Sequence, residues 1–168
     1  MVWNRHIFAM PATELAPALI GKLLCRRAGG NIFRCRITET ECYFGEEDTA
    51  CHAHKGRTPR TETLYAAGGI AYVYLCYGMH NLLNFVTGSE GHPEAVLIRG
   101  VEGISGPGRV TAALGITRAE NRLPLLKKNG LWIEDDGAPP PEWIATPRIG
   151  IGYAAKEDRE RLWRFLKK

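Results

Sequence analysis

Two glutamates stand near the end of a stretch, Phe33 to Tyr43, whose residue pattern predicts a long β-strand. Alternation places Arg34, Arg36, Thr38, Thr40 and Cys42 on one face of it and, on the other, Phe33, Cys35, Ile37, Glu39, Glu41 and Tyr43. The second face therefore begins apolar and ends in carboxylates. A carboxylate at the margin of a core is costly to bury, and its pKa rises unless a partner compensates. Glu41 is thus a candidate general acid or base, and a solvated glutamate at a fraying strand end is the plainer alternative.

The next predicted strand, Ile70 to Tyr77, is unusually rich in tyrosine. Tyr72 and Tyr74 share one face, and Tyr77 lies on the other face near a turn. Cross-strand packing explains most tyrosines in strands, whereas a nucleic-acid enzyme uses such rings to stack on bases or to wedge between them. Asn84 and Arg99 stand at inward positions of the following strands, so each of these polar side chains requires a partner.

A run of two histidines and a cysteine, CHAH at Cys51 to His54, raises the question of zinc, with Cys42 or Cys76 as further ligands. Its spacing matches no structural zinc pattern, and His52 can equally serve as a hydrogen-bonding residue in a pocket. We therefore expect neither a metal nor another cofactor.

Two basic segments offer cations and free backbone amides of the kind that bind phosphate. They are HKGRTPR, with Arg57 and Arg60, and the turn GPGR, with Arg109. Solvated surface charge is the alternative for both. The net charge of +4 allows a polyanionic partner without requiring one.

The elements that must position these residues fit one domain spanning residues 1–168, of the α+β class. We predict a curved, barrel-like antiparallel sheet with a few flanking helices. Five cysteines without a CxxC pair indicate a reducing compartment, and no apolar run is long enough to span a membrane. The expected helices are Met10 to Leu24 and Ser105 to Gly115, and the remaining strands are Leu82 to Thr87, Ala95 to Val101, Leu131 to Glu134 and Arg148 to Tyr153. The tail from Lys156 to Lys168 fits no single element.

Five blocks of sequence in fixed order resemble the alkyladenine (3-methyladenine) DNA glycosylase family. They are ETECYFGEEDTACHAHKGRTPR, AYVYLCYGMHNLLNFV, AVLIRGVE, SGPGR and RIGIGY, and they cover most of the chain from about Leu15 onward. The resemblance implies a base excision repair enzyme that flips a damaged purine from double-stranded DNA and hydrolyses its N-glycosidic bond. It also implies that the protein is a monomer and needs no cofactor. In a bacterium such an enzyme is expected in the cytoplasm, associated with the nucleoid, and in a eukaryote it is expected in the nucleus.

The same resemblance implies a role for particular side chains. Glu41 matches the catalytic glutamate and Arg99 an arginine near the attacking water. Tyr77 matches the residue that intercalates at the vacated position, and Arg109 a basic residue close to the DNA backbone, where we also expect Arg57 and Arg60. The base pocket is expected from Tyr43, His52, Tyr74 and Asn84. No lysine stands at a matched catalytic position, which predicts a monofunctional hydrolase.

The chain departs from longer family members in its minimal N-terminal arm, in His80 after the GM of the hairpin, and in the short connection from Gly100 to Ile104. These departures affect the range of lesions more than the chemistry. Two other hypotheses remain open: a noncatalytic nucleic-acid-binding barrel module, and a metal-dependent hydrolase organised by His52, His54 and nearby cysteines.

Overall fold

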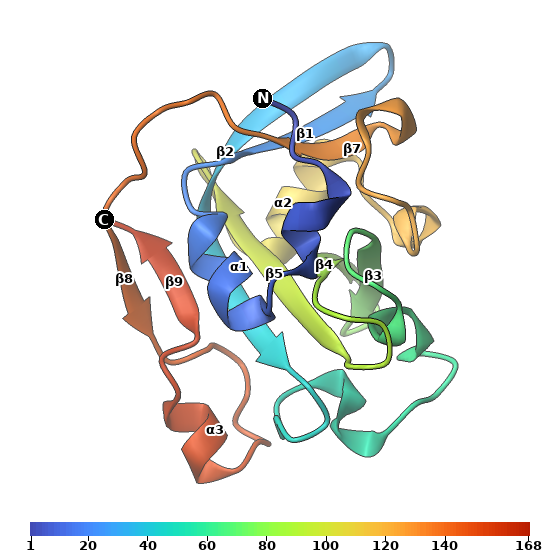
Figure 1. The fold of residues 1–168 in the computed structure, drawn as a ribbon, viewed down its shortest axis with the longest axis vertical. Coiled ribbons are helices and arrows are strands. Elements are labelled where there is room, and N and C mark those ends of the chain that lie inside the picture. Colours follow the sequence, from blue (N-terminus) through green and yellow to red (C-terminus); the bar gives the residue numbers. More distant parts are fainter.

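A curled antiparallel sheet that does not close on itself forms the centre of the computed structural model, which describes residues 1–168 (Figure 1). The strands are β1 (Leu23–Ala28), β2 (Asn31–Phe44), β3 (Ala71–Cys76), β4 (His80–Val86), β5 (Glu94–Val101), β6 (Ile104–Ser105), β7 (Leu131–Glu134), β8 (Trp143–Thr146) and β9 (Arg164–Lys167). The α-helices are α1 (Ala12–Ala18), α2 (Pro107–Leu114) and α3 (Lys156–Glu160). Short 3-10 helices are η1 (Arg5–Ala9), η2 (His52–Lys55), η3 (Glu62–Tyr65), η4 (Arg118–Glu120) and η5 (Lys127–Asn129). The α+β class and the antiparallel sheet are as the sequence predicts.

The strand order β3-β4-β5-β2-β1-β7 makes β2 the centre of the sheet. Its first half pairs with β1, and its second half is flanked by β5 on one side and by β9 on the other. The antiparallel pair of β8 and β9 lies beside β2, away from β3 and β4 (Figure 1). Strands β3, β4 and β5 form the predicted antiparallel meander. A residue late in β2 is therefore fixed by a neighbouring strand on both sides.

Irregular pairing in β2 changes which side chains face the core. Pairing between β2 and β5 shifts between Ile37 and Thr40, as a β-bulge does. Ile37 belongs to the main core, and so does Cys42, although strict alternation placed them on opposite faces. Beyond the bulge, Thr40 and Cys42 face the helices, while Tyr43 lines a pocket on the other side. The prediction that the apolar face itself ends in carboxylates is thus wrong, because the irregular backbone between Ile37 and Thr40 breaks the strict alternation of side chains.

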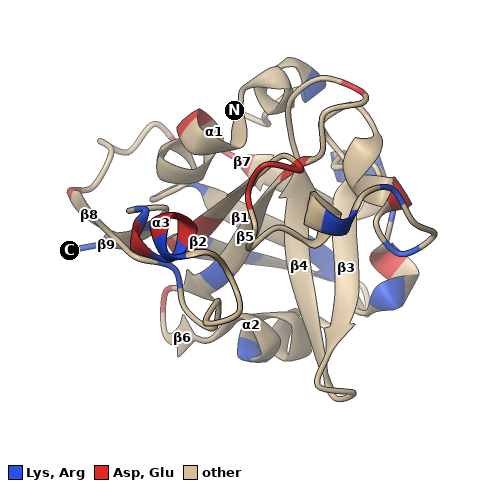
Figure 2. Cartoon of the chain, turned by 90° about the horizontal axis from the view of Figure 1, so that it is seen from below, with Lys and Arg blue, Asp and Glu red and all other residues tan.

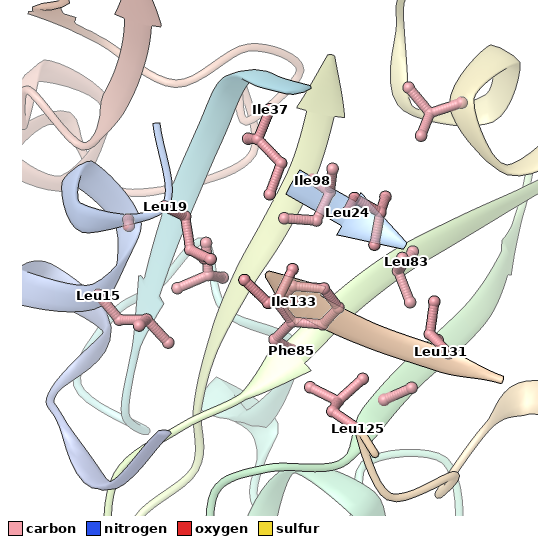
Figure 3. Close-up of a cluster of buried hydrophobic side chains, with 14 of the residues drawn as sticks. Leu15, Leu19, Leu24, Ile37, Leu83, Phe85, Ile98, Leu125, Leu131 and Ile133 are labelled. Atoms are coloured by element: carbon pink, nitrogen blue, oxygen red, sulfur yellow. The ribbon is translucent and has the colours of Figure 1, made fainter. Parts of the chain in front are cut away.

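The main hydrophobic core lies between the sheet and helices α1 and α2 (Figure 3). Helix α1 packs on β2 and β5, and α2 packs on β4 and β5. The fully buried members of this main core include Leu15, Leu83, Phe85, Ile98 and Ile133. A smaller cluster on the other side of β3, β4 and β5 contains Tyr72, Val86 and Ala95 together with residues of the loop after β2. The helices cover one side of these strands, and that loop covers the other.

Some predicted elements differ from the structure. The helix expected from Met10 to Leu24 ends at Ala18, because the chain turns at Gly21, with φ of 88°, and enters the unpredicted strand β1. Arg148 to Tyr153 is not a strand but a turn-rich segment, and β8 lies in what reads as a proline-rich loop. The helix expected from Ser105 to Gly115 is present as α2, and Gly115 caps it in the left-handed conformation. No helix is long and apolar enough to cross a membrane.

Candidate active site

The Glu41 side chain is completely buried. It lines neither the cavity nor the groove described below, and it lies directly behind Tyr43 and Arg99, which do. Its backbone pairs with Leu97 of β5 and with Arg164 of β9, so the residue is held in a central strand. Both carboxylate oxygens accept hydrogen bonds. The Tyr43 hydroxyl donates to Oε2 at 2.8 Å, and the backbone N–H of Ile149 donates to Oε1 at 2.8 Å. This carboxylate is oriented before any substrate arrives.

The electrostatic environment of Glu41 combines opposing effects. Burial raises the pKa of Glu41 above its ordinary value, and the Arg99 guanidinium, the Ile149 amide and the Tyr43 hydroxyl oppose that rise. The Nε of Arg99 lies 3.6 Å from Oε1. Burial and the neighbouring Glu41 raise the pKa of Tyr43 well above the usual range. The phenol therefore keeps its proton and serves as a hydrogen-bond donor to Glu41. A carboxylate with a raised pKa and fixed donors is suited to accept a proton near neutral pH.

Glu39 forms a charged network behind Glu41 that the sequence alone does not reveal. Its Oε1 accepts from the Nε of Arg99 at 3.0 Å and from the Nε of Arg164 at 2.6 Å. Arg99 is thereby held between Glu39 and Glu41. The sequence indicates that the inward-facing Arg99 side chain requires a partner, and these two carboxylates are its partners.

Tyr43, His52, Tyr74 and Asn84, which the resemblance assigns to a base pocket, all line one small aromatic cavity of about 40 Å³. The ring centroids of His52 and Tyr74 are 4.5 Å apart. A groove of about 810 Å³ lies next to this cavity, and Tyr43, His52 and Tyr74 line both. The three aromatic side chains therefore form the boundary between the cavity and the groove.

Tyr72 also lines the cavity, although it is not among the residues expected in the base pocket. Its hydroxyl lies 3.0 Å from Nδ1 of His52. Burial, with a smaller effect of Arg60, lowers the pKa of His52 to about 4, so the imidazole is neutral at physiological pH. Burial raises the pKa of Tyr72 to about 12. The shared face of Tyr72 and Tyr74 was the signal in the sequence that both reach the cavity.

Tyr77 lies at the tip of the β3–β4 hairpin and is 87% exposed. Its φ of 51° is in the left-handed region that disfavours bulky residues, and the Tyr77 side chain lines the groove. The hairpin tip projects past α2 and carries no Lys, Arg, Asp or Glu (Figure 2). A large exposed ring at a strained position is a feature that packing does not explain.

The basic residues expected at a DNA backbone are placed differently from one another. Arg60 and Arg109 line the groove, and the Arg60 guanidinium lies 5.8 Å from the centre of the Tyr74 ring. Arg57 is outside the groove. It makes a bidentate ion pair with Glu62, with distances of 2.7 and 2.6 Å. Glu62 thus neutralises much of the charge that Arg57 would offer to phosphate.

The segment from Arg148 to Tyr153 closes the remaining side of the site. Ile149 supplies the amide that binds Glu41, and Tyr153 lines both the cavity and the groove while its hydroxyl donates to the Ala50 carbonyl. A strand assignment could not reveal these contacts, because they depend on turns that fold the segment back over β2.

The CHAH run does not bring its side chains together. Nδ1 of His52 faces Tyr72, and Nδ1 of His54 faces the Glu46 carbonyl. No three His, Cys, Asp or Glu side chains of the protein converge as metal ligands. The residues of this run therefore do not form the metal site that the hypothesis of a metal-dependent hydrolase requires.

Comparison with known proteins identifies the class of this fold and site. The methylpurine-DNA glycosylase (MPG) family model matches residues 6–105 and 102–168. A Psychrobacter cryohalolentis protein that carries the name 3-methyladenine DNA glycosylase is 43% identical, over 95% of this chain and 88% of its own. A protein of the same name from Myxococcus xanthus is 45% identical over 93% of this chain and 86% of its own length. Another, from Methanocella arvoryzae, is 42% identical over 99% of this chain and 92% of its own length.

The protein is accordingly a DNA glycosylase of the alkylation-repair class, an enzyme whose substrate is DNA. More particularly, the chain belongs to the methylpurine-DNA glycosylase family. The resemblance seen in the sequence is confirmed.

Proposed function

We propose that this DNA glycosylase flips a damaged purine out of duplex DNA and uses Glu41 to direct water at its N-glycosidic bond, leaving an abasic site. The observation that carries the proposal is the buried Glu41 carboxylate, held by Tyr43 and Ile149 beside an aromatic slot that adjoins a groove. An alkylated, deaminated or etheno-modified purine is the proposed substrate.

Extrusion of the base begins in the groove. A damaged or mispaired nucleotide costs least to unstack, which favours lesions before they reach the slot. Tyr77, exposed at the hairpin tip, inserts its ring into the space that the flipped nucleotide leaves. Arg60 and Arg109 contact the phosphate backbone along the groove, with a weaker contribution from Arg57.

Within the slot, the purine stacks against Tyr43, His52 and Tyr74, and Asn84 restricts which groups fit at its floor. His52 is neutral, so its imidazole can exchange hydrogen bonds with a base without adding charge. Aromatic faces also favour a purine that carries positive charge after alkylation or protonation. Such a purine is the better leaving group.

The chemical step requires a proton acceptor and compensation for positive charge that develops on the deoxyribose. An ionised Glu41 supplies both, because it accepts a proton from the attacking water and lies as an anion near the sugar. Arg99, held between Glu39 and Glu41, opposes the effect of burial and favours the ionised form of Glu41. The products are the free base and a DNA strand with an abasic site.

A monofunctional mechanism is proposed because no lysine lines the cavity or the groove. Strand nicking by a glycosylase needs an amine that attacks the sugar carbon and forms a Schiff base. Without such an amine, water is the nucleophile. The enzyme is proposed to act as a monomer.

The deciding experiment is excision from a panel of duplexes that contain hypoxanthine, 1,N6-ethenoadenine, 3-methyladenine or 7-methylguanine, followed by alkaline cleavage of abasic sites. The Glu41→Gln variant, purified identically, is the matched control for contaminating host glycosylase. Abasic sites from at least one purine lesion, absent with the variant and absent from an undamaged duplex, are expected. Binding without release of any base contradicts the proposal and favours the noncatalytic binder.

A further inference from the structure

We propose that Arg148, paired with Asp48, is the positioning residue that fixes both hydrogen-bond donors of the Glu41 carboxylate. The inference rests on the proposed function of Glu41 and adds residues that the mechanism above does not use. Arg148 touches neither the cavity nor the groove, so it acts through Tyr43 and Ile149.

The Arg148 guanidinium ties together three separate parts of the chain. Both its side chain and that of Asp48 are fully buried, and they form a bidentate ion pair with distances of 2.6 and 2.9 Å. The same guanidinium donates to the Cys42 carbonyl at 2.9 Å and to the Asp158 carbonyl at 3.2 Å. It thereby joins the end of β2, the loop after β2 and helix α3.

The first donor that Arg148 positions is the Tyr43 hydroxyl. The centre of the guanidinium lies 4.8 Å from the centre of the Tyr43 ring and 5.0 Å from that of Trp163. A guanidinium held between aromatic rings by a fixed ion pair restricts the angle of each ring. That angle determines whether the Tyr43 hydroxyl reaches Oε2 of Glu41.

The second donor is the backbone N–H of Ile149, the next residue in the chain. No regular secondary structure holds residues 148–150, so the position of this amide depends on how Arg148 is anchored. One buried side chain therefore controls both contacts that orient Glu41. The proposal depends on this arrangement, in which Arg148 packs on the Tyr43 ring and is also the residue before Ile149.

Stability alone is a weak explanation for this ion pair. A buried pair commonly contributes little net stability, because desolvation offsets the attraction between the charges. The Nε of Arg148 is also buried without a hydrogen-bond partner, which adds to the cost. A costly arrangement next to the proposed base is better explained by precise orientation than by the free energy of folding.

The test compares Arg148→Lys and Asp48→Asn with a matched control, Arg26→Lys. Arg26 forms a half-buried pair with Glu120 at 2.7 Å and also has an unpartnered Nε, but it lies on β1, which pairs with β2 only in the range 31–36. For each variant the single-turnover excision rate, the Kd for lesion DNA and the Tm are measured, all on the wild type's best lesion. Trp163→Leu, which removes one ring from Arg148 and leaves its ion pair, is the milder fourth variant.

The expected result is a single-turnover rate at least about tenfold lower for Arg148→Lys and Asp48→Asn, with Kd within about twofold of wild type, since orientation affects chemistry more than binding. Trp163→Leu should lower the rate several-fold. Arg26→Lys should lower Tm without changing the rate. A wild-type rate in every folded variant of Arg148, Asp48 and Trp163 overturns the inference. Failure of the wild type to excise any base instead refutes the proposed function.

Discussion

The two faces of strands β2 to β5 are built from different kinds of residue. Toward α1 and α2 they present Cys42, Val73, Leu83, Phe85 and Ile98, all in one apolar core. On the opposite face the same strands carry tyrosines, an amide and a guanidinium that line the cavity or the groove: Tyr43, Tyr72, Tyr74, Asn84 and Arg99. The Glu39 and Glu41 carboxylates lie behind them, bonded to Arg99 and Tyr43. Residues that alternate along a single strand thus serve folding on one face and chemistry on the other.

The difference shows how a small domain can hold a buried charge. Burial of Glu41 is unfavourable, and its hydrogen bonds and Arg99 only partly compensate, as the raised pKa indicates. The apolar face supplies the stability that makes this arrangement tolerable. Mutations on the site face should therefore lower activity at little cost in stability, and mutations on the core face should do the reverse.

Glu41→Gln should produce the largest effect, a loss of excision rate of about a thousandfold, within the range expected for removal of a general base. The amide still accepts from Ile149 through its oxygen, and the Tyr43 hydroxyl can turn to accept from the amide nitrogen. Single-turnover kinetics, binding of lesion DNA and Tm are measured together. An unchanged or higher Tm with intact binding fits the contrast between faces, while a collapse of Tm would contradict it.

Leu83→Ala tests the opposite face at a fully buried position of β4. The cavity it leaves should lower the free energy of unfolding by about 2–5 kcal/mol. Denaturant unfolding gives that value, and the excision rate per folded molecule should stay close to wild type. Its neighbour Leu82 lines the groove and serves as the matched site-face control. A large rate loss in folded Leu83→Ala protein would show that the two faces are coupled.

Tyr77→Gly separates strain from function at the hairpin tip. Glycine adopts the φ of 51° at no steric cost, so Tm should stay the same or rise. Loss of the ring should lower the excision rate by about 10- to 100-fold, since stacking of an aromatic ring on a base contributes about 1–3 kcal/mol. Tyr77→Phe is the control and should retain most activity. If Tyr77→Gly excises lesions normally, the ring does not assist base flipping.

The acid limb of the pH profile should report the titration of Glu41. Because its pKa is raised by burial, the active ionised form is lost as pH falls, at a pH above the ordinary glutamate value of 4.5. His52, with a pKa of about 4, stays neutral until more acidic conditions. The limb should therefore keep its position in His52→Asn, and it should coincide for two different lesions, which separates it from titration of the base. A limb that moves with His52 would assign it to the imidazole.

Period-two patterns are local signals, and from them the sequence predicts the meander and the long central strand. The resemblance in ordered motifs points to Tyr43, His52, Tyr74 and Asn84, four of the residues that line the cavity. The sequence places Thr40 and Cys42 on the wrong face after Ile37, since a bulge has no distinctive residue pattern here. It also misses the Asp48–Arg148 pair and the roles of Tyr72 and Tyr153. Each depends on a contact between distant segments, such as the fold-back that carries Ile149 to Glu41.

The smallest expected effect concerns two arginines at the rim of the DNA-facing side. Arg109 is exposed, lines the groove and makes no ion pair, whereas Arg57 is paired with Glu62. A phosphate contact adds about one unit to the slope of log Kd against log salt, so Arg109→Ala should lower that slope by about one. Arg57→Ala should change it by less, because binding of phosphate would first have to break the pair with Glu62. Titration of an undamaged duplex at several salt concentrations measures both slopes. Equal reductions in the two variants would mean that Arg57 leaves Glu62 for the DNA. The Glu62→Gln variant, which frees Arg57, is the control. It should steepen the slope of log Kd against log salt only if the Arg57–Glu62 pair persists in the wild-type complex.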